Sequence, residues 1–237
     1  MASYHSLTET ETSAIGLLSI VPILENRYFR ALADGSMPRE EFVRSQVQFF
    51  HAVGFFSRNL ATLIARLPTS AGRAVLVHNL SEEHGLDEEH PAEGFRPQLA
   101  HDRTFAHFLI TLGIGTEELG ASTPEAPVQA FNLALLGACG SESPSFALAA
   151  LGIIEYAFAD ISALIGSWVV ECGWVGAGEL VHYSLHAEID KRHAAELFEA
   201  AEGAVKAGEP DTSILGGLEF GSYIFDRLYK DFSRDKK

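Results

Sequence analysis

Residues 145–170 read SFALAALGIIEYAFADISALIGSWVV, and this stretch decides the fold class. It is long enough to span a bilayer, but Glu155 and Asp160 lie near its middle. Because a carboxylate at the centre of a membrane span is costly, we expect a buried core helix instead. A helix that is apolar on most sides must be surrounded by other protein segments. The stretch therefore predicts a bundle built around one central helix.

Apolar residues in the rest of the chain recur at helical spacing, as Val43, Val47 and Phe50 do, and no strand-like alternation occurs. Proline, glycine and N-cap residues mark the boundaries between the helical stretches. These signals predict helices over residues 8–33, 39–66, 70–90, 97–112, 125–138, 145–171, 176–206 and 211–232. We expect residues 1–237 to form a single all-α domain.

The composition narrows the class of protein. With 47% hydrophobic and 21% charged residues in 237, the chain can build a full core and is not intrinsically disordered. The net charge of -15 repels phosphate, so we expect no nucleic-acid partner. The two cysteines, Cys139 and Cys172, make no disulfide framework. The first residues resemble no export signal, and we expect a cytoplasmic protein without a membrane partner.

Glu155 needs an explanation because a charged carboxylate inside an apolar helix requires a cation, a hydrogen-bond network or a raised pKa. Two other stretches offer suitable partners. In HYSLHAEIDKRH (residues 182–193), His186, Asp190 and His193 fall within about 40° of one another on a helix, in a stripe roughly 10 Å long. In HNLSEEHGLDEEH (residues 78–90), Glu83 and His90 are seven residues apart and would share a helix face.

Together these residues supply three imidazoles and three carboxylates. Such a set suits divalent iron or manganese, whereas structural zinc prefers thiolates. The length of the stripe and the number of ligands favour two metal ions, which carboxylates can bridge.

A simpler interpretation stays open beside this one. A chain with 10 histidines and 32 acidic residues produces single His/acid pairs by chance. The acidic residues at 82–89 could be a solvated helix end, and rival pairs exist at His78–Glu82, His84–Glu88 and Glu179–His182. A ferritin-like site fits poorly, since it needs two Glu-x-x-His motifs on different helices. The alternatives are thus a dinuclear metal site, or surface charge with one satisfied core acid.

The pattern Glu-x6-His, a lone Glu in a later apolar helix, and His-x3-Asp-x2-His resembles the haem-oxygenase-like di-iron oxidases, or iron-containing redox enzymes, over about residues 28–198. The resemblance implies a haem-oxygenase-like bundle of seven to eight helices, a homodimer, two Fe(II) ions and O2 as co-substrate. It implies as iron ligands the residues at the matching positions: Glu83, His90, Glu155, His186, Asp190 and His193.

Departures from related sequences bear on the reaction. Relatives of the chlamydial type use their own tyrosines to make 4-aminobenzoate, but by our alignment Phe29 stands at the early tyrosine position, beside Tyr28. Ile154 stands at the second, with Tyr156 close by, and Ile165 replaces a lysine. TenA-type hydrolases need a cysteine in the helix that here carries Glu155, whereas Cys139 lies one helix earlier.

We therefore expect a di-iron oxidase or oxygenase that acts on a small organic substrate, such as an amino acid or a fatty acid. Manganese would accept the same ligands. Three residues near the predicted ligands are candidates for a substrate pocket, namely Tyr156, Asp160 and His182. The alternatives are a TenA-like hydrolase and a metal-free binding protein with the same fold.

Overall fold

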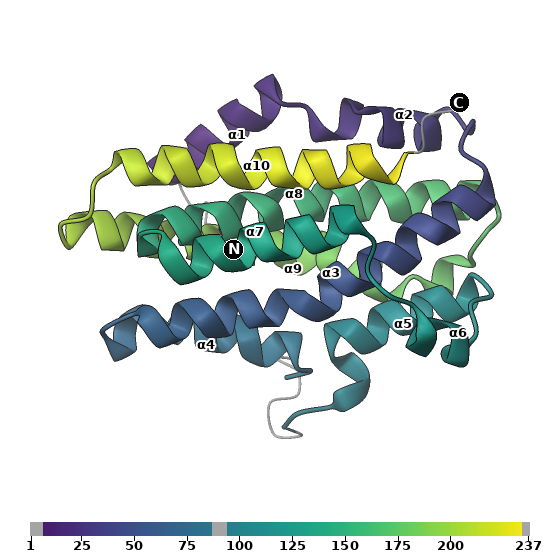
Figure 1. The fold of residues 1–237 in the computed structure, drawn as a ribbon, viewed down its shortest axis with the longest axis horizontal. Helices are drawn as coiled ribbons and strands as arrows, with labels where there is room; N and C mark the ends of the chain where they lie inside the picture. The colour runs from purple at the N-terminus through teal and green to yellow at the C-terminus, as the bar shows by residue number, and fades with distance from the viewer. Residues whose placement is uncertain (1–6, 87–93, 234–237) are drawn as a thin grey trace, which may run out of the picture.

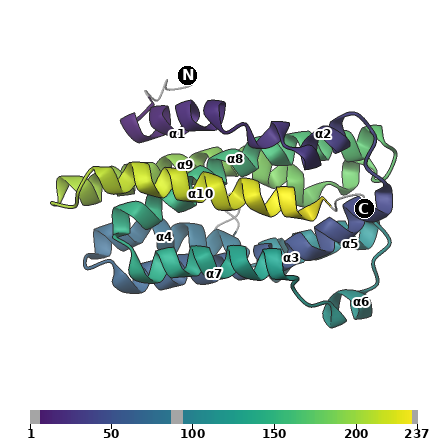
Figure 2. The ribbon, with the colours of Figure 1, turned by 45° about the horizontal axis from the view of Figure 1, so that its top comes forward.

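The computed structural model describes residues 7–86 and 94–233, which form an all-α bundle (Figures 1 and 2). This confirms the predicted fold class. The ten α-helices of the described residues are α1 (Glu9–Ile20), α2 (Arg27–Ala33), α3 (Arg39–Arg66), α4 (Ser70–Glu83), α5 (His101–Thr111), α6 (Thr116–Ala121), α7 (Ala126–Ser141), α8 (Pro144–Glu171), α9 (Val181–Lys206) and α10 (Thr212–Phe232). Three 3-10 turns, η1 (Ile23–Glu25), η3 (Pro97–Leu99) and η4 (Ala177–Glu179), precede α2, α5 and α9.

The apolar helix α8 lies at the centre of the bundle. It packs most extensively against α9 and α10, and most of its apolar window, 78%, is buried inside the protein. α10 approaches α8 so closely that a Cβ on Gly221 would lie 2.6 Å from the carbonyl oxygen of Ala150. The only candidate membrane span among the described residues is thus the core helix of the bundle, as its internal carboxylates predicted.

Most predicted helices match the structure closely, and the long ones, α3, α8, α9 and α10, differ by few residues. The predicted helix over 8–33 is wrong as a single element. Pro22 disfavours helical backbone at the preceding residue and cannot donate a hydrogen bond, so the chain passes through η1 instead. Asn26 then begins α2 by accepting hydrogen bonds from the backbone N–H groups of Tyr28 and Phe29. The short helix α6 was not predicted.

The predicted helix over 70–90 is also wrong, because α4 ends at Glu83. Gly85 adopts a left-handed φ of 91°, and its N–H donates to Glu82 while the N–H of Leu86 donates to Ser81. This is the Schellman arrangement that ends a helix. The assumption that Glu83 and His90 share one continuous helix therefore fails, and His90 itself lies outside the described residues.

Candidate metal centre

Buried titratable side chains from four helices converge beside α8. α4 ends at Glu83, α5 begins at His101, α8 contributes Glu155, and α9 contributes His182, His186, Asp190 and His193. All of these side chains are buried, with Asp190 and His193 completely inaccessible to solvent. The structure thus brings five of the six predicted ligands to one region, and the sixth, His90, cannot be placed.

One half of this region contains Glu155, Asp190 and His193. One ligand atom of each of these residues lies within 4.8 Å of the other two. The Nε2 atom of His193 donates to Glu82 at 2.8 Å, and its Nδ1 lies 3.9 Å from Asp190 without a hydrogen-bond partner in the described part of the chain. Three potential ligand atoms are thus close enough together to bind one cation.

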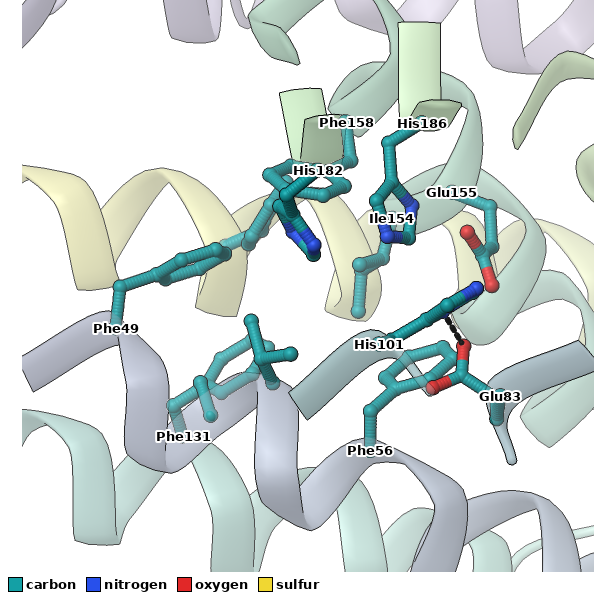
Figure 3. A pocket seen from close by; sticks show the side chains of 13 residues that line it. Phe49, Phe56, Glu83, His101, Phe131, Ile154, Glu155, Phe158, His182 and His186 are labelled. Carbon is teal, nitrogen blue, oxygen red and sulfur yellow. Dashed lines mark ion pairs between the residues drawn. The ribbon is translucent and has the colours of Figure 1, made fainter. Parts of the chain in front are cut away.

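The other half contains Glu83, His101 and His186. Oε1 of Glu83 lies 2.9 Å from Nδ1 of His101, and the rings of His101 and His186 are 4.4 Å apart between centroids (Figure 3). His186 donates from Nδ1 to Asp190 at 2.8 Å, so Asp190 connects the two halves. The unprotonated Nε2 of His186 has no partner among the described residues.

The pKa values of the acids reflect this crowding. Burial, followed by the negative charge of Asp190, raises the pKa of Glu155 well above its ordinary value. Burial likewise raises the pKa of Asp190 well above its ordinary value, and Glu83 adds to the effect. Burial opposes ionisation of Glu83 as well, but the adjacent His101 outweighs it and lowers the pKa. A cation between these carboxylates would remove the repulsion that now disfavours their charged forms.

The pKa values of the imidazoles follow their partners. Burial and the neighbouring His101 hold the pKa of His186 well below its ordinary value, so this ring is neutral. Burial alone would also lower the pKa of His101 and His193, but carboxylates raise both: Glu83 acts on His101, and Glu82 acts on His193. The neutral His186 is in the form that binds a metal ion.

The buried atoms left without partners test whether this set fits a metal. Among the described residues, four such atoms belong to predicted ligands: Oε1 of Glu155, Nε2 of His186, Oδ2 of Asp190 and Nδ1 of His193. Buried polar groups are almost always hydrogen-bonded, so four orphans in one place need a common explanation. Two imidazole nitrogens and two carboxylate oxygens are the ligand types that iron and manganese accept. The residues fit the metal.

An apolar cavity of about 50 Å³ opens on this region. Its wall consists mainly of aromatic rings, which are Phe49, Phe56, Phe131, Phe158 and Phe225, together with Ile154 (Figure 3). Its polar end consists of Glu83, His101, Glu155, His182 and His186. The cavity therefore combines reactive groups at one end with an apolar surface that would hold a substrate.

The three predicted substrate-pocket residues do not lie together in the structure. His182 lines the cavity. Tyr156 and Asp160 do not line the cavity. They lie on a different face of α8 from Glu155 and line a separate groove next to α1. There Lys191 binds both of them, with Nζ 3.0 Å from Asp160 and 3.3 Å above the ring centre of Tyr156.

Two functional candidates escaped the sequence analysis. His101 enters the site from α5, and no periodic pattern links it to the predicted ligands. Glu82 was weighed only as part of a solvated helix end or as a partner of His78. In the structure it is buried, contacts His78 at 3.4 Å, and accepts hydrogen bonds from Arg192 at 2.6 Å and His193 at 2.8 Å. Burial opposes its ionisation, but these hydrogen bonds lower its pKa to about 2.

Replacing Glu82 by glutamine is expected to weaken iron binding by about 10- to 100-fold. A carboxylate that holds the far nitrogen of a ligand histidine fixes the ring and increases its basicity, and losing such partners has costs of this size. Anaerobic equilibrium dialysis with Fe(II) measures the effect. Glu196→Gln is the matched control, since Glu196 also pairs with Arg192, at 3.5 Å, but is not a partner of His193. Equal iron affinity in both variants would contradict this role.

Comparison with known proteins also indicates an iron-containing protein. The family model described as "Iron-containing redox enzyme", of the haem-oxygenase type, matches residues 43–218. The chain belongs to the iron-containing redox enzyme family. The resemblance noted in the sequence is thereby confirmed. The matched residues of this family member include every predicted ligand.

One curated relative of this family member is a 4-aminobenzoate synthase from Chlamydia muridarum (strain MoPn / Nigg). It is 22% identical over 175 residues, which cover 73% of this chain and 70% of the relative.

Solved structures confirm the haem-oxygenase-like fold. A TenA homologue from Pseudomonas syringae pv. tomato has a TM-score of 0.73 at 16% identity, covering 96% of this chain and 92% of its own. A domain with a haem-oxygenase-like fold from Shewanella denitrificans has a TM-score of 0.72 at 15% identity, with coverage of 97% and 93%. A CADD-like protein from Nostoc punctiforme has a TM-score of 0.72 at 14% identity, with coverage of 94% and 95%.

Proposed function

We propose that this iron-containing redox enzyme is a di-iron oxidase or oxygenase that uses O2 to oxidise a small organic substrate. The observation that carries the proposal is the group of four candidate ligand atoms beside an apolar cavity, none of which has a hydrogen-bond partner among the described residues. A purely structural core acid would need one hydrogen-bond partner, whereas this site leaves one atom on each of two carboxylates and two imidazoles without a partner in that part of the chain.

The ligands divide between two positions. Glu155, Asp190 and His193 would hold one ion, because their ligand atoms already lie within 4.8 Å of one another. Glu83 and His186 would hold the second, with His90 as a further ligand whose position lies outside the described residues. When bound, two ferrous ions supply the electrons that reduce O2.

The protein's own residues prepare the site for this chemistry. Glu82 fixes His193, and Asp190 fixes His186, so both imidazoles present a defined nitrogen. The aromatic wall excludes bulk water and places an apolar substrate beside the ligands. The substrate classes that suit such a site are amino acids and fatty acids with an apolar portion.

An alternative to an external substrate is a tyrosine of the chain itself, as the resemblance to the chlamydial type implies. Among the described residues, no tyrosine lines the cavity. The hydroxyl of Tyr28 is buried and bound to Ser45 at 2.7 Å and Gln46 at 2.9 Å, and Tyr156 faces another groove. This arrangement favours an external substrate.

Anaerobic titration with Fe(II), followed by exposure to O2 in an oxygen electrode, tests the proposal. We expect two iron ions per chain and consumption of O2 that depends on bound iron. Absence of bound iron would contradict it and favour the metal-free binding protein. Bound iron that does not react with O2 would contradict the oxidase or oxygenase activity.

The TenA-like alternative makes a separate prediction at Cys139. This thiol is buried in α7, does not line the described cavity, and has its pKa raised by burial to about 12. Since the thiolate is the nucleophile, Cys139 should be inert. Thiol reagents are expected to label the exposed Cys172 in the folded protein and Cys139 only after unfolding. The Cys139→Ala variant should bind iron and consume O2 as the wild type does, whereas a thiol-dependent hydrolase would lose its activity.

A further inference from the structure

His182 lies at the polar end of the cavity but belongs to none of the predicted ligand positions. It is completely buried on α9, one turn before His186, and the two ring centres are 4.2 Å apart. Its Nδ1 lies 2.9 Å from the hydroxyl oxygen of Thr104 on α5. Its Nε2 is buried and has no partner among the described residues.

The contacts of Thr104 favour one tautomer of His182. The Thr104 hydroxyl lies 3.0 Å from the carbonyl oxygen of His101, which can only accept, and 2.9 Å from Nδ1 of His182, which can donate or accept according to its tautomer. Both contacts are hydrogen bonds when the hydroxyl donates to the carbonyl and accepts from Nδ1, so we assign the proton of the neutral imidazole to Nδ1. The remaining nitrogen, Nε2, then carries a lone pair and is a hydrogen-bond acceptor.

The surroundings of His182 favour an uncharged ligand over a third metal position. The charged groups that act on His182 are His186 and His101, which together with burial hold its pKa well below the ordinary value, and no carboxylate is among them. Figure 3 shows His182 near Phe49 and Phe158, with Glu155 and Glu83 on the far side of His186. A divalent cation at Nε2 would lack the negative charge that the neighbouring ligand groups provide.

We propose that Nε2 of His182 accepts a hydrogen bond from the substrate, and that the part of the substrate inside the cavity is narrow and mainly apolar and has an uncharged hydroxyl or amino donor. The apolar part would lie along the phenylalanine wall, and the donor would be held next to His186. The inference rests on the proposed function, because it takes the cavity to be the place where the substrate reacts. The preference for a hydrogen-bond donor itself requires no metal.

A pair of isomeric probes tests this preference. 1-Hexanol and 1-methoxypentane contain the same atoms, but only the alcohol can donate a hydrogen bond. Calorimetry on the full-length chain, before and after anaerobic loading with Fe(II), gives the ratio of their dissociation constants. We expect His182→Leu to reduce the preference for the alcohol about tenfold relative to wild type, as loss of one buried hydrogen bond implies. His182→Gln, which restores an acceptor oxygen, should recover most of it.

Thr104→Val provides a second test that leaves the imidazole in place. Removing the hydroxyl frees the tautomer, so the preference should fall and ¹⁵N NMR of labelled histidine should no longer show His182 protonated only at Nδ1. Thr111→Val is the matched control, because Thr111 makes the same local bond, to the carbonyl of Phe108 at 2.7 Å, and has no histidine partner among the residues that the structure describes.

The inference is overturned if wild type shows no preference for the alcohol, including failure to bind either probe, or if the preference survives in His182→Leu. Loss of iron from His182→Leu would also overturn it, because it would make His182 a ligand. Failure of the proposed function is distinct, since it would appear as absence of iron in wild type whatever the probe ratio.

Discussion

Replacing Glu155 by alanine is expected to reduce bound iron from two ions per chain to at most one, and to weaken any remaining binding by at least about 100-fold. Glu155 is the only carboxylate that α8 contributes to the cavity, and its Oε1 is buried without a partner among residues 7–86 and 94–233. Nearby side chains cannot replace it, because Asp190 and Glu83 are already shared with His186 and His101. Anaerobic dialysis with metal analysis measures the loss, and circular dichroism checks that helix content is retained.

Asp160→Ala is the control for this variant. Asp160 lies on the same helix but is half exposed and pairs with Lys191 outside the cavity. Iron binding should be unchanged in Asp160→Ala. Two iron ions in Glu155→Ala would remove Glu155 from the ligand set and would favour the interpretation as a satisfied core acid.

The second large effect concerns stability. Fe(II) at 100 to 1,000 times its dissociation constant is expected to increase the free energy of unfolding of the wild type by about 3–4 kcal/mol for each ion bound. Without metal, and at a pH where Glu155 would be charged, Glu155→Gln should be more stable than wild type by about 2 kcal/mol, because it removes an acid whose charged form is disfavoured by burial and by Asp190. The same variant should gain little stability from iron. Urea unfolding at several pH values, with and without metal, measures the gain of each protein from iron and the difference between the two metal-free proteins.

The pH dependence of the metal-free protein has a definite sign. The pKa of Glu155 is higher in the folded protein than in the unfolded chain, where it stays near its ordinary value of 4.5. The folded state therefore binds more protons between these two values, and stability falls as pH rises through that range. Glu155→Gln should show a smaller fall. An equal dependence on pH in wild type and Glu155→Gln would contradict the raised pKa.

The fold was predictable because its longest helices carry strong periodic patterns. α8 could be placed at the centre from its apolar composition, and its membrane interpretation could be rejected from Glu155 and Asp160. The end of α4 was missed although Gly85 is a helix-stop residue, because the acidic run after it suggested a continuing helix. Local signals at Pro22 and Asn26 would also have separated α1 from α2.

The site was predictable where candidate ligands share one helix face, as His186, Asp190 and His193 do, and where a carboxylate interrupts an apolar helix, as Glu155 does. His101 and Glu82 were not predicted, because their proximity to the other candidates depends on tertiary packing. His101 meets Glu83 only because α5 begins beside the end of α4. Glu82 appeared to be a surface acid, and its partners Arg192 and His193 become evident only when α9 packs against α4. Tyr156 and Asp160 were placed near Glu155 by sequence distance, which does not control the direction of a helical side chain.

Anaerobic loading of crystals with Fe(II), followed by an anomalous difference map at the iron absorption edge, tests the central claim most directly. Our account predicts two peaks per chain, one bounded by Glu155, Asp190 and His193 and the other bounded by Glu83 and His186. A map without peaks in this region, or with iron only on surface carboxylates, would contradict it.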